Sequence, residues 1–138
     1  MKLKRSDIQA LAAAFQYLDG RQEAAKDADG RSVVVVKPYD LPVGVRYAIG
    51  RNLRHLKPAL EAIQDTRTAI IKKHSGNTGV IKAGTPEHAA ADQEIAELLR
   101  GEDEVEVHRI KVTDLNIGTN QIAGSVIEAL LPILDGEI

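Results

Sequence analysis

Residues 45–74 read VRYAIGRNLRHLKPALEAIQDTRTAIIKKH, and this stretch decides the fold. Its apolar residues recur mostly in steps of three and four, at positions 45, 49, 53, 56, 60, 63 and 70. This spacing is typical of a helix with one apolar face. Asp40 and Pro42 suit the start of a helix, and the polar run SGNTG follows His74. The sequence therefore predicts one long helix over about residues 42–74.

The apolar face of this helix also carries Arg67 and His74. Because an unpaired buried charge is strongly destabilising, Arg67 needs water, a carboxylate or a ligand. Three interpretations stay open: a side chain that snorkels at the rim, a register-setting ion pair with Glu94, Glu97 or a second chain, and a contact with a ligand phosphate. The candidate interface or register residues are Leu53, Leu56, Leu60, Ile63, Arg67, Ile70 and His74.

Pro58 stands inside the same helical pattern, on the side opposite the apolar face. A proline there removes the hydrogen bond to the carbonyl of Arg54, which also points outward, so water can satisfy that carbonyl. A kink in one helix and a break into two helices near Lys57 both remain open.

The outer side of the helix is basic. Its candidate ligand- or partner-binding residues are Arg46, Tyr47, Arg51, Arg54 and Lys57. Such a face can hold phosphates, although basic helix faces are more often simply solvated. The sequence pI of about 6.1 argues against nucleic acid as the partner, because nucleic-acid-binding domains are usually clearly basic.

The first part of the chain predicts two shorter elements. Ser6 or Asp7 can cap a helix that ends at Gly20. The run QEAAKDADG is typical of a polar turn, and the four valines after it indicate a buried strand that Pro38 ends.

Further along, Thr85 and Pro86 have the order of a helix cap and a first helical residue. A second strand follows, and Thr119 can cap a last helix that Pro132 ends. We expect a single domain, 1–138. The predicted fold class is α+β, with a long helical hairpin (about 42–74 and 86–100), a small sheet (about 32–37 and 104–112) and terminal helices.

Motifs for catalysis or metal binding do not stand out. The run DADG begins like a calcium loop, but Arg31 and Pro38 occupy positions where that loop needs oxygen ligands. HSGNTG lacks the ending of a phosphate-binding loop, and the four histidines lack metal-ligand spacing. We therefore expect no enzyme, no metal and no cofactor.

Composition bears on the compartment. The chain has no cysteine, which agrees with a reducing environment. Its start lacks the long apolar segment of a signal peptide, and no apolar run approaches the roughly 18 residues of a membrane span. These features predict a cytoplasmic protein that does not enter a membrane.

Two stretches, LPVGVRYAIGRNLRHLKPALEAIQDTRTAIIKKH and VEVHRIKVTDLNIGTNQIAGSVIEALLPIL, resemble a group of small proteins encoded by tailed bacteriophages. The resemblance covers about residues 40–134 and implies an accessory protein in the host cytoplasm. It carries no catalytic residues.

Two functional hypotheses follow from the sequence. The first is a non-enzymatic accessory protein that acts by binding a protein partner or by homo-oligomeric assembly. The alternative is a counter-defence protein that sequesters a nucleotide or another phosphorylated small molecule serving as an immune signal. A small enzyme is a third and weaker hypothesis.

Overall fold

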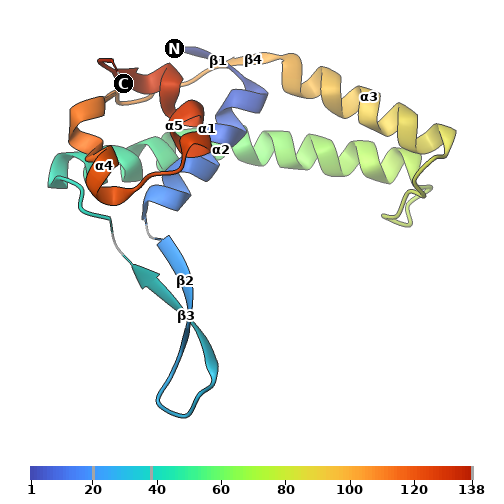
Figure 1. Cartoon of the computed structure of the whole chain (residues 1–138). Helices are drawn as coiled ribbons and strands as arrows, with labels where there is room; N and C mark the ends of the chain where they lie inside the picture. Colours follow the sequence, from blue (N-terminus) through green and yellow to red (C-terminus); the bar gives the residue numbers. More distant parts are fainter. Residues whose placement is uncertain (20, 38, 138) are drawn as a thin grey trace. The chain divides into compact units, whose positions relative to one another are not determined.

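The computed structural model describes residues 1–19, 21–37 and 39–137, with all their side chains except those of residues 21–23 and 35–37. The helices are α1 (Arg5–Asp19), α2 (Val43–His74), α3 (Pro86–Arg100), α4 (Ile117–Asn120) and α5 (Gly124–Leu130). The strands are β1 (Lys2–Lys4), β2 (Arg21–Lys26), β3 (Ser32–Lys37), β4 (Glu102–Glu104), β5 (Ile110–Lys111) and β6 (Leu134–Asp135). Figure 1 shows these elements, and the predicted α+β class is confirmed.

Within the described residues the strands form three two-stranded sheets rather than the one small sheet that we expected. β1 pairs with β4 and β2 with β3, both antiparallel, whereas β5 and β6 are parallel. The expected sheet of residues 32–37 and 104–112 is therefore wrong, because the valine strand pairs with its neighbour in sequence. That neighbour, β2, lacks β-branched residues, and we had assigned its sequence to a turn.

The DADG run lies in the turn between β2 and β3. The carboxylate of Asp27 accepts hydrogen bonds from the backbone N–H groups of Asp29 and Arg31, each at 2.9 Å. Gly30 has a φ of +76°, a conformation that a residue without Cβ adopts most easily. DADG is therefore a turn, as the failed calcium pattern indicated.

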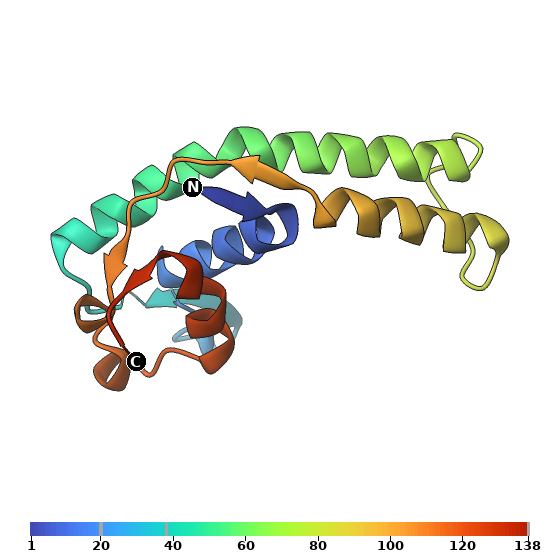
Figure 2. The same ribbon diagram turned by 90° about the horizontal axis from the view of Figure 1, so that it is seen from above.

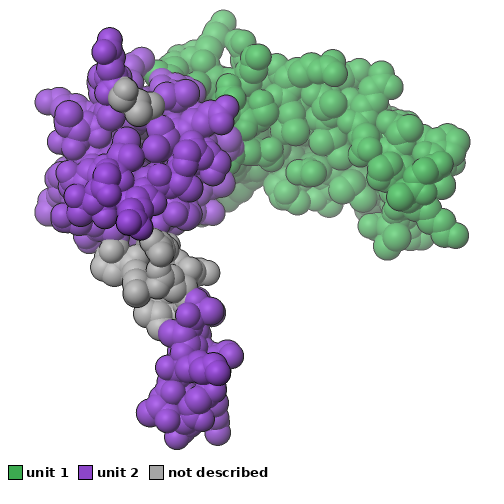
Figure 3. Space-filling model, in the orientation of Figure 1, with its two compact units in different colours: residues 1–9, 55–106 green, residues 10–54, 107–138 purple. Residues whose placement is uncertain are grey.

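The chain divides into two compact units, which Figure 3 colours separately. The first unit holds residues 1–9 and 55–106, and the second holds residues 10–54 and 107–138. Both α1 and α2 contribute residues to each unit.

The first unit contains the helical hairpin. Figures 1 and 2 show α3 lying alongside the part of α2 that belongs to this unit. Thr85 caps α3, its hydroxyl accepting a hydrogen bond from the N–H of His88 at 3.3 Å. Ile63 of α2 and Ala91 of α3 are buried. The predicted hairpin is confirmed with its predicted helix ends, Val43–His74 and Pro86–Arg100.

The end of α3 is tied to the start of α1. The Arg5 guanidinium contacts both carboxylate oxygens of Asp103, at 3.2 and 3.3 Å, and donates to the carbonyl of Leu98 at 3.1 Å. Gly101 leaves room for this guanidinium, since a Cβ at that position would collide with it. A side chain at this position would require the Arg5 guanidinium to shift.

Pro58 does not divide α2, which is continuous from Val43 to His74. The proline is exposed, as its predicted place on the outer side requires. Of the two alternatives that the sequence left open, the break is wrong.

The second unit is built around apolar residues from both ends of the chain. Fully buried side chains come from α1, α2 and the C-terminal segment: Leu11, Phe15, Ile49, Leu115, Leu130 and Ile133. The expected last helix is present as α5 but begins later than a cap at Thr119 predicts, because Gln121 has a φ of 50° and separates α4 from α5. The expected end of α1 at Gly20 lies outside the described residues.

Candidate functional site

The predicted basic side of α2 is present, but several of its charged groups already have partners. Arg46 donates to the backbone carbonyls of Tyr39 and Leu41, at 3.0 and 3.3 Å. This arginine holds the segment that precedes α2, so its guanidinium is partly occupied by the fold itself.

Arg51 and Tyr47 form a pair one helical turn apart. The guanidinium carbon of Arg51 lies 5.9 Å from the centre of the Tyr47 ring, and Arg51 Nη1 donates to the tyrosine hydroxyl at 3.4 Å. Tyr47 is 64% exposed. A cation over an exposed aromatic ring contributes about 0.5–1 kcal/mol, so this pair is available to a partner at small cost.

Arg54 and Lys57 complete the predicted set, and both are exposed. The Lys57 ammonium lies 3.9 Å from the Glu61 carboxylate one turn further along. Such an exposed pair contributes little free energy. Arg46, Tyr47, Arg51 and Arg54 belong to the second unit and Lys57 to the first.

The predicted apolar face of α2 is mostly covered within the chain. Leu56 and Ile63 are buried, and the remaining members of the predicted set are half-buried, namely Leu53, Leu60, Arg67, Ile70 and His74. Leu56 and Ile63 therefore offer little surface to a second chain.

Arg67 is half-buried, and its guanidinium makes no hydrogen bond or ion pair with any other described residue. The carboxylate proposed for it is engaged elsewhere: Glu94 accepts from Lys73 Nζ at 2.9 Å and lies 2.8 Å from His74 Nε2. The Arg67–Glu94 ion pair that we considered is therefore absent among the described residues. A side chain at the rim of the apolar face agrees with these observations.

The Glu94 cluster joins α2 to α3 inside the first unit. Hydrogen bonds from Lys73, and then from His74, hold the pKa of Glu94 below its usual range. Hydrogen bonds to a carboxylate and a nearby ammonium both favour its ionised form. His74 thus belongs to a contact between α2 and α3 within one chain.

Two buried asparagines were missed in the sequence. Asn52 is wholly buried on α2, where its side chain exchanges two hydrogen bonds with the backbone of His108, at 3.0 and 2.7 Å. The side chain of Asn120 bonds to both the N–H and the C=O of Asp40. Both asparagines satisfy backbone groups outside regular structure.

A groove in the second unit lies between α1 and α5 and encloses about 380 Å³. None of its lining side chains carries a formal charge, and four are alanines: Ala10, Ala13, Ala14, Tyr17, Ser125, Val126 and Ala129. The sequence analysis did not single out this surface, although ALAAAFQY has a run of small residues.

The groove side of α1 is set by helical spacing. Positions 10, 13, 14 and 17 share one face, whereas Leu11, Phe15 and Leu18 turn into the core. Tyr17 is held against Tyr39, with ring centres 5.5 Å apart and planes at 36°. α1 thus presents small side chains at one end of this face and a large aromatic ring at the other.

The part of the chain that the structure describes has neither a cluster of metal ligands nor a helix suited to a membrane. In the described part of the chain, no three His, Asp or Glu side chains gather as metal ligands would. None of the described helices combines the length and the apolar character that crossing a membrane requires.

Comparisons with models of protein families, with curated proteins and with solved structures gave no match to this chain.

Proposed function

We propose that this chain is a non-enzymatic binding protein that works as a homodimer, with the groove between α1 and α5 as its interface. Binding or homo-oligomeric assembly is also the first of the functional hypotheses that follow from the sequence. The observation that carries the proposal is the uncharged, alanine-lined groove on the surface of the second unit.

The shape of the α1 face supports pairing with a second copy. A dimer with twofold symmetry brings the same surface patch of each subunit together. Ala10 and Tyr17 are seven residues apart, roughly 10 Å along the helix axis. When two α1 helices meet antiparallel, the Tyr17 ring of one copy lies opposite the small Ala10 of the other. The large and small ends of the face then complement each other.

Charge and size also favour this arrangement. With no charged side chain lining the groove, pairing two copies brings no like charges together there. Alanines allow two helices to approach closely and lose almost no side-chain entropy on burial.

Stable interfaces bury about 1,200–2,000 Å² in total, more than one short groove supplies. We therefore expect a weak dimer, with a dissociation constant on the order of micromolar.

Sedimentation equilibrium across the micromolar range tests the proposal. The unaltered chain should show a monomer–dimer equilibrium, and Ala13→Glu should shift it to monomer because two buried, unpaired carboxylates oppose association. Ala62→Glu is the matched control: Ala62 is also an exposed helical alanine, but it lies on α2 in the first unit.

The Ala62→Glu variant should dimerise like the unaltered chain. A chain that stays monomeric at all these concentrations would overturn the proposal, and so would equal weakening by the two variants.

A further inference from the structure

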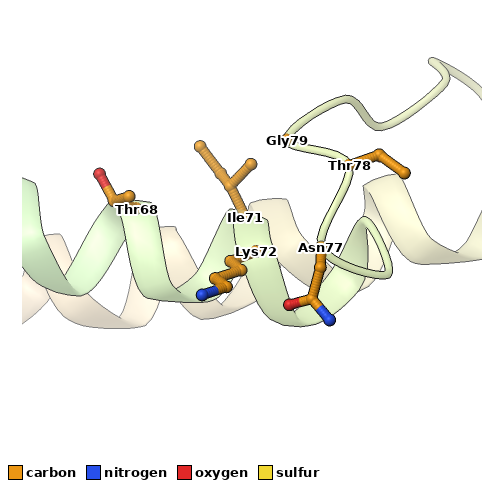
Figure 4. A pocket seen from close by; sticks show the side chains of 6 residues that line it. All are labelled: Thr68, Ile71, Lys72, Asn77, Thr78 and Gly79. Carbon is orange, nitrogen blue, oxygen red and sulfur yellow. The ribbon is translucent and has the colours of Figure 1, made fainter.

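The tip of the helical hairpin carries a second pocket, in the first unit and separate from the groove. It encloses about 420 Å³, within the range of about 300–1,000 Å³ that small-molecule pockets occupy. Its lining residues come from the end of α2 and from the loop that follows: Thr68, Ile71, Lys72, Asn77, Thr78 and Gly79. Figure 4 shows the loop residues standing beside the α2 side chains.

We propose that this pocket binds a small molecule that carries a phosphate group, with Lys72 and Asn77 holding the phosphate and Ile71 contacting the rest of the ligand. The inference concerns a different unit from the proposed dimer groove and does not depend on dimerisation.

The charge of the tip supports an anionic ligand. Residues 66–86 include four lysines and arginines and no aspartate or glutamate. Of these cations, Lys73 is paired with Glu94 of α3. Lys72 is exposed and forms no ion pair with another residue in the described part of the chain. Its ammonium is therefore available to a ligand that enters the pocket.

Other side chains that can donate hydrogen bonds line the same pocket. The Asn77 side chain makes no hydrogen bond to any described residue, so its amide group can donate. The hydroxyl of Thr68 accepts from Gln64 at 3.4 Å and keeps its own hydrogen for another acceptor. A phosphate carries a charge of about −1.5 to −2 and several strong acceptor oxygens, which suits this set better than a neutral group would.

The loop is already held in shape without a ligand. Thr78 Oγ1 donates to the carbonyl of Ser75 at 2.8 Å, and the hydroxyl of Ser75 accepts from the N–H of Gly79 at 3.0 Å. The N–H of Asn77 donates to the carbonyl of Lys72 at 3.1 Å. A preformed loop loses less entropy when a ligand binds.

The end of a helix is the negative end of its dipole, which opposes an anion. Here that effect is reduced, because loop N–H groups cap the final carbonyls of Ile71 and Lys72. Lys72, in the last turn of α2, adds a positive charge at the same place, whereas the charge of Lys73 is balanced by Glu94. The local field therefore favours an anion over a cation.

The apolar part of the pocket indicates a ligand that has an apolar portion in addition to its phosphate group. Ile71 is half-buried and points into the space beside Gly79, as Figure 4 shows. Together with the methyl group of Thr68, it offers an aliphatic surface for a ring or a chain. The ligand class is thus a phosphate ester with an apolar or cyclic portion, such as a nucleoside phosphate.

Amide chemical shifts of the full chain, titrated separately with AMP, inorganic phosphate and adenosine, test the inference. AMP should shift the amides of Asn77, Thr78 and Gly79 saturably, phosphate should do so at higher concentration, and adenosine should not. Lys72→Ala should weaken AMP binding about tenfold or more, the effect expected for a charge-assisted contact.

Two further variants are compared with Lys72→Ala. Lys73→Ala removes the same charge from the neighbouring residue, whose ammonium is bound to Glu94, and should leave AMP binding within about twofold. Asn77→Gly keeps the left-handed backbone, φ 71°, and removes the amide, so AMP binding should also weaken. Absence of saturable shifts with AMP and phosphate would overturn the inference, as would equal weakening by Lys72→Ala and Lys73→Ala.

Discussion

At the scale of single residues, Asn52 is the clearest example of a polar group that the fold requires. It lies three residues after Ile49 and four before Leu56, on the apolar face of α2. Its side chain forms hydrogen bonds with both the N–H and the C=O of His108, as a neighbouring β-strand would. Asn52, like Arg67, is a polar residue on the apolar face of α2. The helical spacing that identified Arg67 could therefore also have identified Asn52.

Replacing Asn52 by alanine should destabilise the chain by about 1–3 kcal/mol, because two backbone groups lose their partner and a cavity is left. Urea unfolding measured by circular dichroism gives the change in free energy. Gln64→Ala, on the exposed side of the same helix, should change it by less than about 0.5 kcal/mol. Equal effects of the two substitutions would contradict this role for Asn52.

At the scale of elements, α2 shows how a helix tolerates an internal proline. Pro58 is exposed, so water can reach the carbonyl that lacks a hydrogen bond. The apolar face on the other side, including Leu56 and Ile63, stays buried and keeps the helix continuous. Packing of that face outweighs the local cost of the proline.

Pro58→Ala should therefore stabilise the chain. A proline inside a helix costs about 3 kcal/mol relative to alanine, whereas its stiffening of the unfolded chain returns about 0.4–1 kcal/mol, which leaves a net gain of about 2 kcal/mol. Urea unfolding should show a higher midpoint. Pro42→Ala, before the first turn of α2, is the control and should have a smaller effect. A loss of stability in Pro58→Ala would mean that the packing depends on the proline.

At the scale of the whole molecule, ion pairs connect segments distant in sequence within each unit. In the first unit, Arg5 binds Asp103, and Glu94 bridges α3 to Lys73 and His74 of α2. In the second unit, Arg109 and Asp135 lie 2.9 Å apart. Stability should consequently depend on pH in the range where carboxylates become protonated.

Glu94 should account for part of this dependence. Because its folded-state pKa is lowered, its contribution is complete above the usual glutamate pKa of about 4.3 and is lost as the pH falls through the folded-state value. The melting temperature of Glu94→Gln should therefore lie below that of the unaltered chain at pH 7, and the difference should shrink towards about pH 3.

Glu97→Gln, on the exposed side of α3, is the matched control and should show little change at either pH. A Glu94→Gln deficit that stays constant with pH would contradict the role given to the Glu94 carboxylate.

Long-range pairing explains most of the differences between prediction and structure. The helical hairpin was predictable to within about one residue at each end, since helices depend on local spacing and on caps such as Thr85. The three small sheets were not, because strand pairing depends on which distant segments meet, and β1, β4, β5 and β6 have two or three residues each. The groove between α1 and α5 was missed for the same reason.

By itself, the sequence determined the α+β class, the long α2 and its partner α3, because helical periodicity and capping are local properties of the chain. Only the tertiary structure decided that Glu94 binds Lys73 and His74 rather than Arg67. It also decided which surfaces remain open, namely the groove on α1 and the pocket beside Lys72. The groove and the Glu94 contacts bring together side chains from distant parts of the chain, and no local pattern records such proximity.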